Sequence, residues 1–198
     1  MSDASTRIVL ASTSATRAKL LRDAGIEFTA CAPGIDERAA ERGLADPAAI
    51  AGALAAAKAV AVSTRLPAAL VIGSDQTLEL GGVALHKPGS RAAAAAQLAR
   101  LAGRGHRLHT AVAVARAGRV EWWHLATVTL VMRPLGPAEI ERYLDRAGDA
   151  ALGSVGAYQV EGLGIQLFER IDGDWFAILG LPLLPLLAYL RARGVAGL

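Results

Sequence analysis

Two long segments of alternating apolar and polar residues, 106–116 and 119–132, flank the dipeptide Ala117-Gly118. A period of two is typical of strands that bury one face, and a short glycine-containing connection joins such strands into an antiparallel pair. These segments predict a long β-hairpin, which restricts the chain to folds that contain a sheet.

Short strands and helices alternate along the rest of the chain. Residues 8–11 predict a buried strand, and Ser12, Thr13 and Ser14 follow as a turn whose hydroxyls can cap a helix over residues 16–24. A second buried strand is expected at residues 69–73, ending at Ser74-Asp75. Further helices are expected over residues 46–64, 90–101, 137–148 and 182–193, with a hairpin of 77–80 and 83–85 around Gly81-Gly82.

This order of elements predicts an α/β fold with a mixed sheet. No internal repeat and no break in composition divides the 198 residues, so we expect a single domain over residues 1–198. Residues 1–6 are expected to form a loose tail.

Composition disfavours several classes of partner. A net charge of +3 gives a weak field, and the aromatic residues lie mainly in apolar segments, so we expect no nucleic-acid partner. The single cysteine, Cys31, cannot form an internal disulfide, and no secretory leader is recognisable, so we expect a cytoplasmic protein. The longest apolar run, 175–190, is shorter than a membrane span and contains glycine and proline, so we expect no membrane partner.

Several common motifs of nucleotide-binding and metal-binding sites are absent from the sequence. It contains no Walker A loop, no G-x-G-x-x-G, no H-E-x-x-H and no paired C-x-x-C. His106 and His109 are three residues apart in a predicted strand, which places them on opposite faces and argues against a shared zinc ion.

Polar residues instead gather at the junctions of predicted elements. Lys58 falls on the apolar face of its helix, Asp75 follows a buried strand, and Lys87 is held extended by the proline after it. A buried carboxylate requires donors, a metal or a substrate, and a hydroxyl-bearing helix N-terminus suits an anion. The set therefore suggests carboxylates for a divalent metal and cations for phosphates.

Each residue also has a purely structural interpretation. Ser14 is an ordinary helix cap, Arg17 a solvated helix residue, and Asp36-Glu37 a surface turn. Lys58 can extend its ammonium to solvent along apolar surface. Taken one at a time, these residues do not distinguish a site from a surface.

The order of these motifs resembles the Maf family of nucleoside triphosphate pyrophosphatases. Residues 10–21, L-A-S-T-S-A-T-R-A-K-L-L, are similar to the family pattern L-A-S-x-S-P-R-R-x-x-L-L. The other family motifs are D-E, K-A, G-A-D-T, K-P, A-Y-G-I-Q-G and G-L-P-L, which resemble Asp36-Glu37, Lys58-Ala59, residues 73–76, Lys87-Pro88, residues 157–162 and residues 180–183.

The resemblance implies an elongated mixed sheet with two lobes around a central cleft, and a homodimer. It also implies hydrolysis of a nucleoside triphosphate between the α and β phosphates with Mg²⁺ or Mn²⁺. The residues that it places at a catalytic site are Asp75, Lys87 and Glu37, with Asp75 and Glu37 at the metal. The residues that it places against the substrate are Ser12, Ser14, Arg17, Lys58, Gln76 and Glu161.

Several departures from the family pattern bear on the predicted site. Ala15 and Thr16 replace proline and an arginine, and Gln76 follows Asp75 where threonine is usual. Glu161 replaces a glutamine, so an acceptor-only group stands where the family has amide donors. The sequence therefore does not decide whether the nucleobase of the substrate is a pyrimidine, 7-methylguanine or another modified base.

Two further hypotheses compete with the enzyme. The altered motifs are also consistent with a catalytically impaired nucleotide-binding protein that regulates cell division through partners. A nucleic-acid-binding module is a third possibility, and it predicts binding that weakens steeply with salt.

Overall fold

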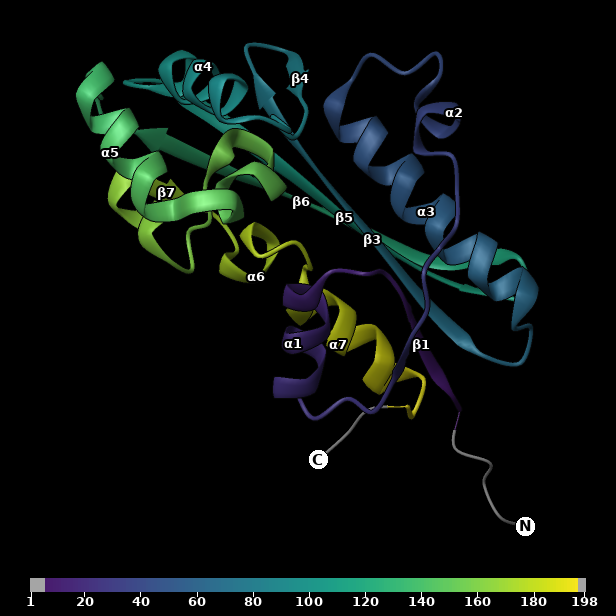
Figure 1. The fold of residues 1–198 in the computed structure, drawn as a ribbon. Helices are drawn as coiled ribbons and strands as arrows, with labels where there is room; N and C mark the ends of the chain where they lie inside the picture. The colour runs from purple at the N-terminus through teal and green to yellow at the C-terminus, as the bar shows by residue number, and fades with distance from the viewer. Residues whose placement is uncertain (1–5, 196–198) are drawn as a thin grey trace.

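The structure is a computed structural model that describes residues 6–195. Within these residues the chain forms an α/β fold around one mixed sheet of seven strands (Figure 1). The strand order is β2-β1-β3-β5-β6-β7, and β4 pairs with β3. The predicted fold class is confirmed, whereas most of the tail expected at residues 1–6 lies outside the described residues.

Parallel strands form one side of the sheet and antiparallel strands the other. β1 pairs in parallel with both β2 and β3, whereas every pairing from β3 through β5 and β6 to β7 is antiparallel, as is that of β3 with β4. The strands are β1 (Ile8–Ala11), β2 (Thr29–Ala30), β3 (Leu70–Leu80), β4 (Val83–Leu85), β5 (Gly105–Arg116), β6 (Arg119–Met132) and β7 (Phe168–Asp172).

The expected helices are present with small shifts at their ends. The α-helices are α1 (Ala15–Asp23), α2 (Glu37–Glu41), α3 (Pro47–Arg65), α4 (Arg91–Leu101), α5 (Pro137–Ala147), α6 (Trp175–Ile178) and α7 (Leu183–Ala192). Three short 3₁₀ helices are η1 (Gly148–Gly153), η2 (Val155–Ala157) and η3 (Leu163–Leu167). The recurring glycines of residues 153–180 predict strand and turn, whereas the structure there consists mainly of short helices, β7 and α6.

The two faces of the sheet are covered differently. α3 packs along one face against β3 and β5. On the other face, α1 and α7 pack over one end of the sheet, and α4, α5 and the 3₁₀ helices over the other end (Figure 1). The two groups of helices form separate apolar clusters, and a cleft lies between them.

α3 lies unusually close to the sheet because the contact consists of small residues. Ala51, Ala55 and Ala59 of the helix pack against alanines of β5. At Gly73 of β3, a Cβ atom would lie 2.3 Å from the backbone oxygen of Ala55, so only glycine fits there. This close approach brings the next turn of α3 within reach of the side chains that follow Gly73.

α3 is the one helix within residues 6–195 with the length and apolar composition of a membrane-crossing segment. Half of its most apolar window is buried inside the protein. Its alanine-rich face packs on the sheet, and this packing accounts for its composition.

β3 differs from its prediction in a way that positions the site. The strand expected to end at Ser74-Asp75 continues to Leu80, because β5 pairs with it from Val71 to Glu79. Along the other edge of β3, pairing with β1 ends at Gly73, which lies opposite Ala11, and pairing with β4 starts at Leu78, which lies opposite Leu85. Residues 74–77 lie between these two neighbours, and Asp75 is therefore at mid-strand, beside a gap in the sheet.

Candidate active site

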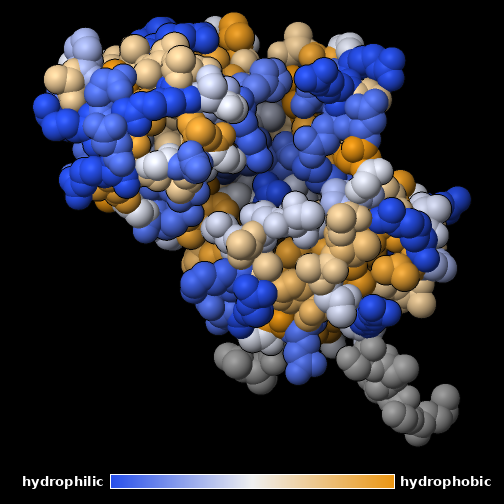
Figure 2. Space-filling model, viewed as in Figure 1, coloured by the Kyte–Doolittle hydropathy of each residue, from blue (hydrophilic) through white to orange (hydrophobic). Residues whose placement is uncertain are grey.

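A cleft of about 680 Å³ opens at this gap. On the face shown in Figure 2 it forms a hollow whose visible walls are largely hydrophilic. All nine residues predicted for the site line it: Ser12, Ser14, Arg17, Glu37, Lys58, Asp75, Gln76, Lys87 and Glu161. The structure thus gathers residues from six segments that are distant in sequence.

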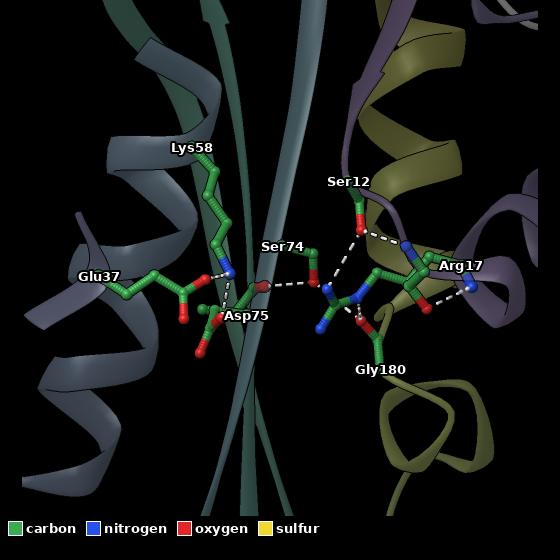
Figure 3. Close-up of polar contacts among 9 residues, drawn as sticks. Ser12, Arg17, Glu37, Lys58, Ser74, Asp75 and Gly180 are labelled. Carbon is green, nitrogen blue, oxygen red and sulfur yellow. Dashed lines mark hydrogen bonds and ion pairs between the residues drawn. The ribbon is translucent and has the colours of Figure 1, made fainter. Parts of the chain in front are cut away.

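Lys58 connects two carboxylates on the α3 side of the sheet. Its ammonium lies 2.5 Å from Oδ1 of Asp75 and 2.7 Å from Oε1 of Glu37 (Figure 3). The side chains of Lys58 and Asp75 are about nine-tenths buried, whereas that of Glu37 is about half exposed. Lys58 therefore pairs with anions and does not extend to solvent, and Glu37 opens a five-residue helix where a surface turn was the competing interpretation.

The electrostatic setting of Asp75 favours a carboxylate of raised basicity. Burial raises the pKa of Asp75 above its usual value, while the charge and hydrogen bond of Lys58 and the charge of Arg17 lower it. Glu37 adds a smaller upward contribution to the same pKa. Lys58 holds Oδ1, and no residue among 6–195 donates a hydrogen bond to Oδ2. That oxygen is available to a ligand in the cleft.

The N-terminus of α1 forms the opposite wall. Ser14 caps the helix by accepting from the backbone N–H of Arg17, and its own N–H donates to the hydroxyl of Ser12. Arg17 donates from Nη1 to Ser12 at 3.4 Å and from Nε to the carbonyl of Gly180 at 2.7 Å. The capping role of Ser14 is confirmed, and it presents a helix N-terminus and a guanidinium to the same space.

Lys87 and Glu161 lie at the rim. Both side chains are exposed, and no ion pair or side-chain hydrogen bond holds either of them among the described residues. Thr16, which stands where the family has an arginine, is half-buried in the cleft wall. The rim therefore presents the ammonium of Lys87 on one segment and the carboxylate of Glu161 on another.

The side-chain amide nitrogen of Gln76 makes its hydrogen bonds within the protein. Nε2 lies 2.9 Å from the carbonyl of Ala177, 3.0 Å from that of Ile178 and 2.9 Å from the hydroxyl of Thr110. An amide nitrogen has two protons, so these three acceptors use its full donor capacity. The carbonyl oxygen of Gln76 is the part of this side chain left for a substrate.

An apolar compartment adjoins the polar one. Its walls are formed by Leu85, Leu108, Tyr158 and Val160, which belong to the apolar cluster under α4, α5 and the 3₁₀ helices. Tyr158 is fixed by His106, whose Nε2 lies 2.9 Å from the phenol oxygen. Burial lowers the pKa of His106 to about 4, which keeps this imidazole neutral. The compartment is suited to the flat, mostly apolar part of a ligand.

His106 and His109 point to opposite faces, as predicted. His109 lies on the α3 side, where its ring bonds Glu79 and Thr127. Within residues 6–195, no group of three or more His, Cys, Asp or Glu side chains is placed to hold a metal. Asp75 and Glu37 provide two carboxylates, a donor set that suits a Mg²⁺ ion whose remaining ligands are phosphate oxygens and water.

Sequence reasoning missed Ser74 and Gly180 as parts of the site. Ser74 is fully buried on the face of β3 opposite Asp75, and its hydroxyl lies 2.8 Å from the carbonyl of Gly180. The period of two along a strand places residues 74 and 76 together on that face, which was the available signal. Gly180, the partner of Ser74, is 106 residues away in sequence, so no local sequence pattern indicates the contact.

The family model described as "Maf-like protein" matches residues 7–193, nearly the whole chain. The chain belongs to the Maf-like family. The motifs at Leu10–Leu21, Lys58, Asp75 and Lys87 that carried the resemblance all line one cleft, or lie beside it, in this Maf-like protein.

Curated relatives match over similar lengths. A protein of Rhodopseudomonas palustris strain BisB18, named nucleoside triphosphate pyrophosphatase, is 54% identical over 94% of this chain and 93% of its own. A Brucella abortus protein, named 7-methyl-GTP pyrophosphatase, is 53% identical over 93% and 95%. A Rhizobium johnstonii protein of the same name is 54% identical over 95% and 96%. This Maf-like protein is therefore similar to proteins of both names.

Proposed function

We propose that this Maf-like protein is a nucleoside triphosphate pyrophosphatase, which cleaves a triphosphate to the monophosphate and pyrophosphate. The observation that carries the proposal is the pairing of buried Asp75 with Lys58 on one side of β3, and Arg17 with the α1 N-terminus on the other, around one cleft. The names of the relatives support the same reaction.

Asp75 orients the attacking water and accepts its proton at Oδ2. Lys58 holds Oδ1, so the carboxylate has one fixed orientation. The raised pKa of Asp75 makes its carboxylate a stronger base than that of an exposed aspartate.

Cations neutralise the phosphates. Phosphoryl transfer demands mainly positioning and charge stabilisation, and the charge on the leaving pyrophosphate grows in the transition state. Arg17 and the amides at the N-terminus of α1 line the cleft together with Lys87, which belongs to a separate segment. Ser12 and Ser14 add hydroxyls beside the same amides.

A divalent cation, Mg²⁺ or Mn²⁺, would be held by Asp75 and Glu37 together with the substrate. When bound, it supplies charge neutralisation on the phosphate oxygens. Lys58 compensates the two carboxylates before the cation and the triphosphate arrive. A titration of the protein with Mg²⁺ alone should therefore show much weaker binding than a titration in the presence of triphosphate.

The apolar compartment beside Tyr158 takes the nucleobase, and Glu161 and the Gln76 carbonyl oxygen lie within the same cleft. Both are acceptors, so they favour a base that presents donors or positive charge. Canonical and modified nucleoside triphosphates, including 7-methyl-GTP, form the panel that tests this. Pyrophosphate release from at least one of them with Mg²⁺ supports the proposal. Binding without release from any of them favours the division-regulating nucleotide-binding protein.

We further propose a cytoplasmic homodimer. Trp123 is 63% exposed and, with Val120 and Leu125 of β6, borders an apolar groove along α3. Light scattering is expected to give a mass of twice the 20.4 kDa chain. A mass equal to one chain at micromolar concentration would contradict the dimer.

Lys87→Ala is expected to raise KM for the triphosphate and to lower kcat. The ammonium acts on a group that gains negative charge in the transition state, so we expect kcat/KM to fall by about tenfold or more. Steady-state kinetics measures both constants. Lys19→Ala is the matched control, because Lys19 is exposed and pairs with Asp23 on the outer side of α1. Equal kinetics for the two variants would remove Lys87 from the site.

A further inference from the structure

Ser74 and Gln76, the two neighbours of Asp75 in β3, bind the backbone segment that in turn binds Arg17. Ser74 and Gln76 point to the face of β3 opposite Asp75 and bond the backbone carbonyls of residues 177–180. The carbonyl of Gly180 in turn accepts from Nε of Arg17 at 2.7 Å (Figure 3). Three consecutive residues of β3 thus contact both halves of the site.

The Gly180 carbonyl is a shared acceptor. Ser74 Oγ lies 2.8 Å from it on one side and Arg17 Nε on the other, and neither side chain is free to choose a different rotamer without losing this bond. Oγ of Ser74 also lies 2.7 Å from the carbonyl oxygen of Ala111. The single hydroxyl proton is therefore shared between two carbonyl acceptors, those of Ala111 and Gly180. The hydroxyl therefore ties the 180 carbonyl to the central strands β3 and β5.

Gly180 itself permits the contact. Its φ of +94° lies in the region that favours glycine, and a Cβ atom built there would lie 3.3 Å from Arg17 Nε. A side chain at this position would strain the backbone and press on the guanidinium. The backbone oxygen can approach Arg17 because nothing else projects from residue 180 toward it.

We infer that Ser74 is a positioning residue that fixes the Arg17 guanidinium through the Gly180 carbonyl, and so sets the distance between Asp75 and the phosphate site. Nε is used for this bond and Nη1 makes one long bond to Ser12, which leaves Nη2 and the second proton of Nη1 for a phosphate in the cleft. Because Ser74 and Asp75 are adjacent on one rigid strand, the base and the phosphate ligand keep a constant separation. The inference rests on the proposed role of Arg17 as a phosphate ligand.

A double-mutant cycle tests the inference with pyrophosphate as the probe. Calorimetric dissociation constants are measured for the wild type, Ser74→Ala, Arg17→Lys and the double variant. Lysine keeps the charge but lacks the guanidinium fork, so we expect Arg17→Lys to weaken binding about tenfold. Ser74→Ala is expected to weaken binding about three- to tenfold in the wild type and less than about twofold in the Arg17→Lys background.

Ser63→Ala is the matched control. Ser63 is also fully buried and also makes two hydrogen bonds, to Val60 and Gly118, but it lies outside the cleft. It is expected to leave pyrophosphate binding unchanged even where it lowers the melting temperature as much as Ser74→Ala does. This comparison separates positioning from a general loss of stability.

The outcomes distinguish two failures. If Arg17→Lys leaves pyrophosphate binding unchanged, or the wild type does not bind pyrophosphate, the phosphate role in the proposed function is wrong and the inference falls with it. If Arg17→Lys weakens binding but Ser74→Ala acts equally in both backgrounds, or has no effect in the wild type, only the positioning role is overturned.

Discussion

Asp75→Asn is expected to lower kcat for triphosphate hydrolysis by about 10²- to 10⁴-fold, the usual contribution of a positioned general base. The amide has almost the same shape as the carboxylate but cannot accept the proton of the attacking water. Because Lys58 keeps Glu37 as a partner, the variant is expected to fold and to bind triphosphate. Rapid-quench or steady-state kinetics with product detection gives kcat, and calorimetry gives the binding constant.

The pH profile offers an independent check on the same residue. Burial raises the pKa of Asp75, so its carboxylate is protonated at a higher pH than an ordinary aspartate. We expect wild-type kcat/KM to fall as the pH falls through this raised pKa. Asp145→Asn serves as a control, because Asp145 is exposed, lies outside the cleft and pairs with Arg91 of α4. A kcat for Asp75→Asn within a factor of a few of the wild type would contradict the assignment.

Lys58→Met is expected to lower the free energy of unfolding by about 3 kcal/mol at pH 8, the low end for removing one partner of a buried ion pair. Methionine replaces the apolar stem of Lys58 but leaves Asp75 buried without its counter-charge. Urea unfolding curves measure the loss. Lys19→Met removes an exposed pair with Asp23 and is expected to cost under about 1 kcal/mol.

The cost of Lys58→Met is expected to depend on pH in a defined direction. Lys58 lowers the pKa of Asp75, so its loss raises that pKa further in the folded state. The folded variant then binds a proton that the unfolded chain releases, and its stability increases as the pH falls through the raised pKa. The difference in stability from the wild type is therefore largest at high pH and shrinks as the pH falls through the raised pKa of Asp75. The acid limb of kcat/KM should move to higher pH in the same variant, whereas a penalty independent of pH would contradict the pairing.

Much of the fold followed from local sequence patterns. The alternation around Ala117-Gly118 predicted the β5–β6 hairpin, and Asp46-Pro47 predicted the start of α3. The spacing of Lys58 predicted its place on the apolar face of α3, which the structure confirms, but it did not decide between solvent and an anion as the partner of the ammonium. These features depend on side chains that are near one another in sequence, which is why the pattern reveals them.

The continuation of β3 past Asp75 could not be predicted from a local sequence pattern. Ser74, Asp75 and Gln76 interrupt an apolar run, and polar residues after such a run usually mark a strand end. The strand continues because β5 pairs with it on one side throughout, while its other edge is open to the cleft between β1 and β4. The length of a partner strand is a tertiary property.

Two other features were hidden for related reasons. α2 has only five residues, fewer than two turns, so no helical period marks it. The bond from Arg17 to Gly180 spans 163 positions and ends on a backbone carbonyl, which carries no side-chain signal. The catalytic, metal and substrate roles given to Asp75, Glu37, Lys87 and their neighbours stay predictions, although the residues themselves line one cleft.

Analysis of the reaction products shows whether the protein cleaves the bond between the α and β phosphates. The wild-type protein is incubated with Mg²⁺ and the nucleoside triphosphate that it turns over fastest, and the products are separated by anion-exchange chromatography. We predict nucleoside monophosphate and pyrophosphate in equal amounts, with both formed at least about a hundredfold more slowly by Asp75→Asn. Nucleoside diphosphate with inorganic phosphate, or no turnover of any triphosphate that the protein binds, would contradict this cleavage.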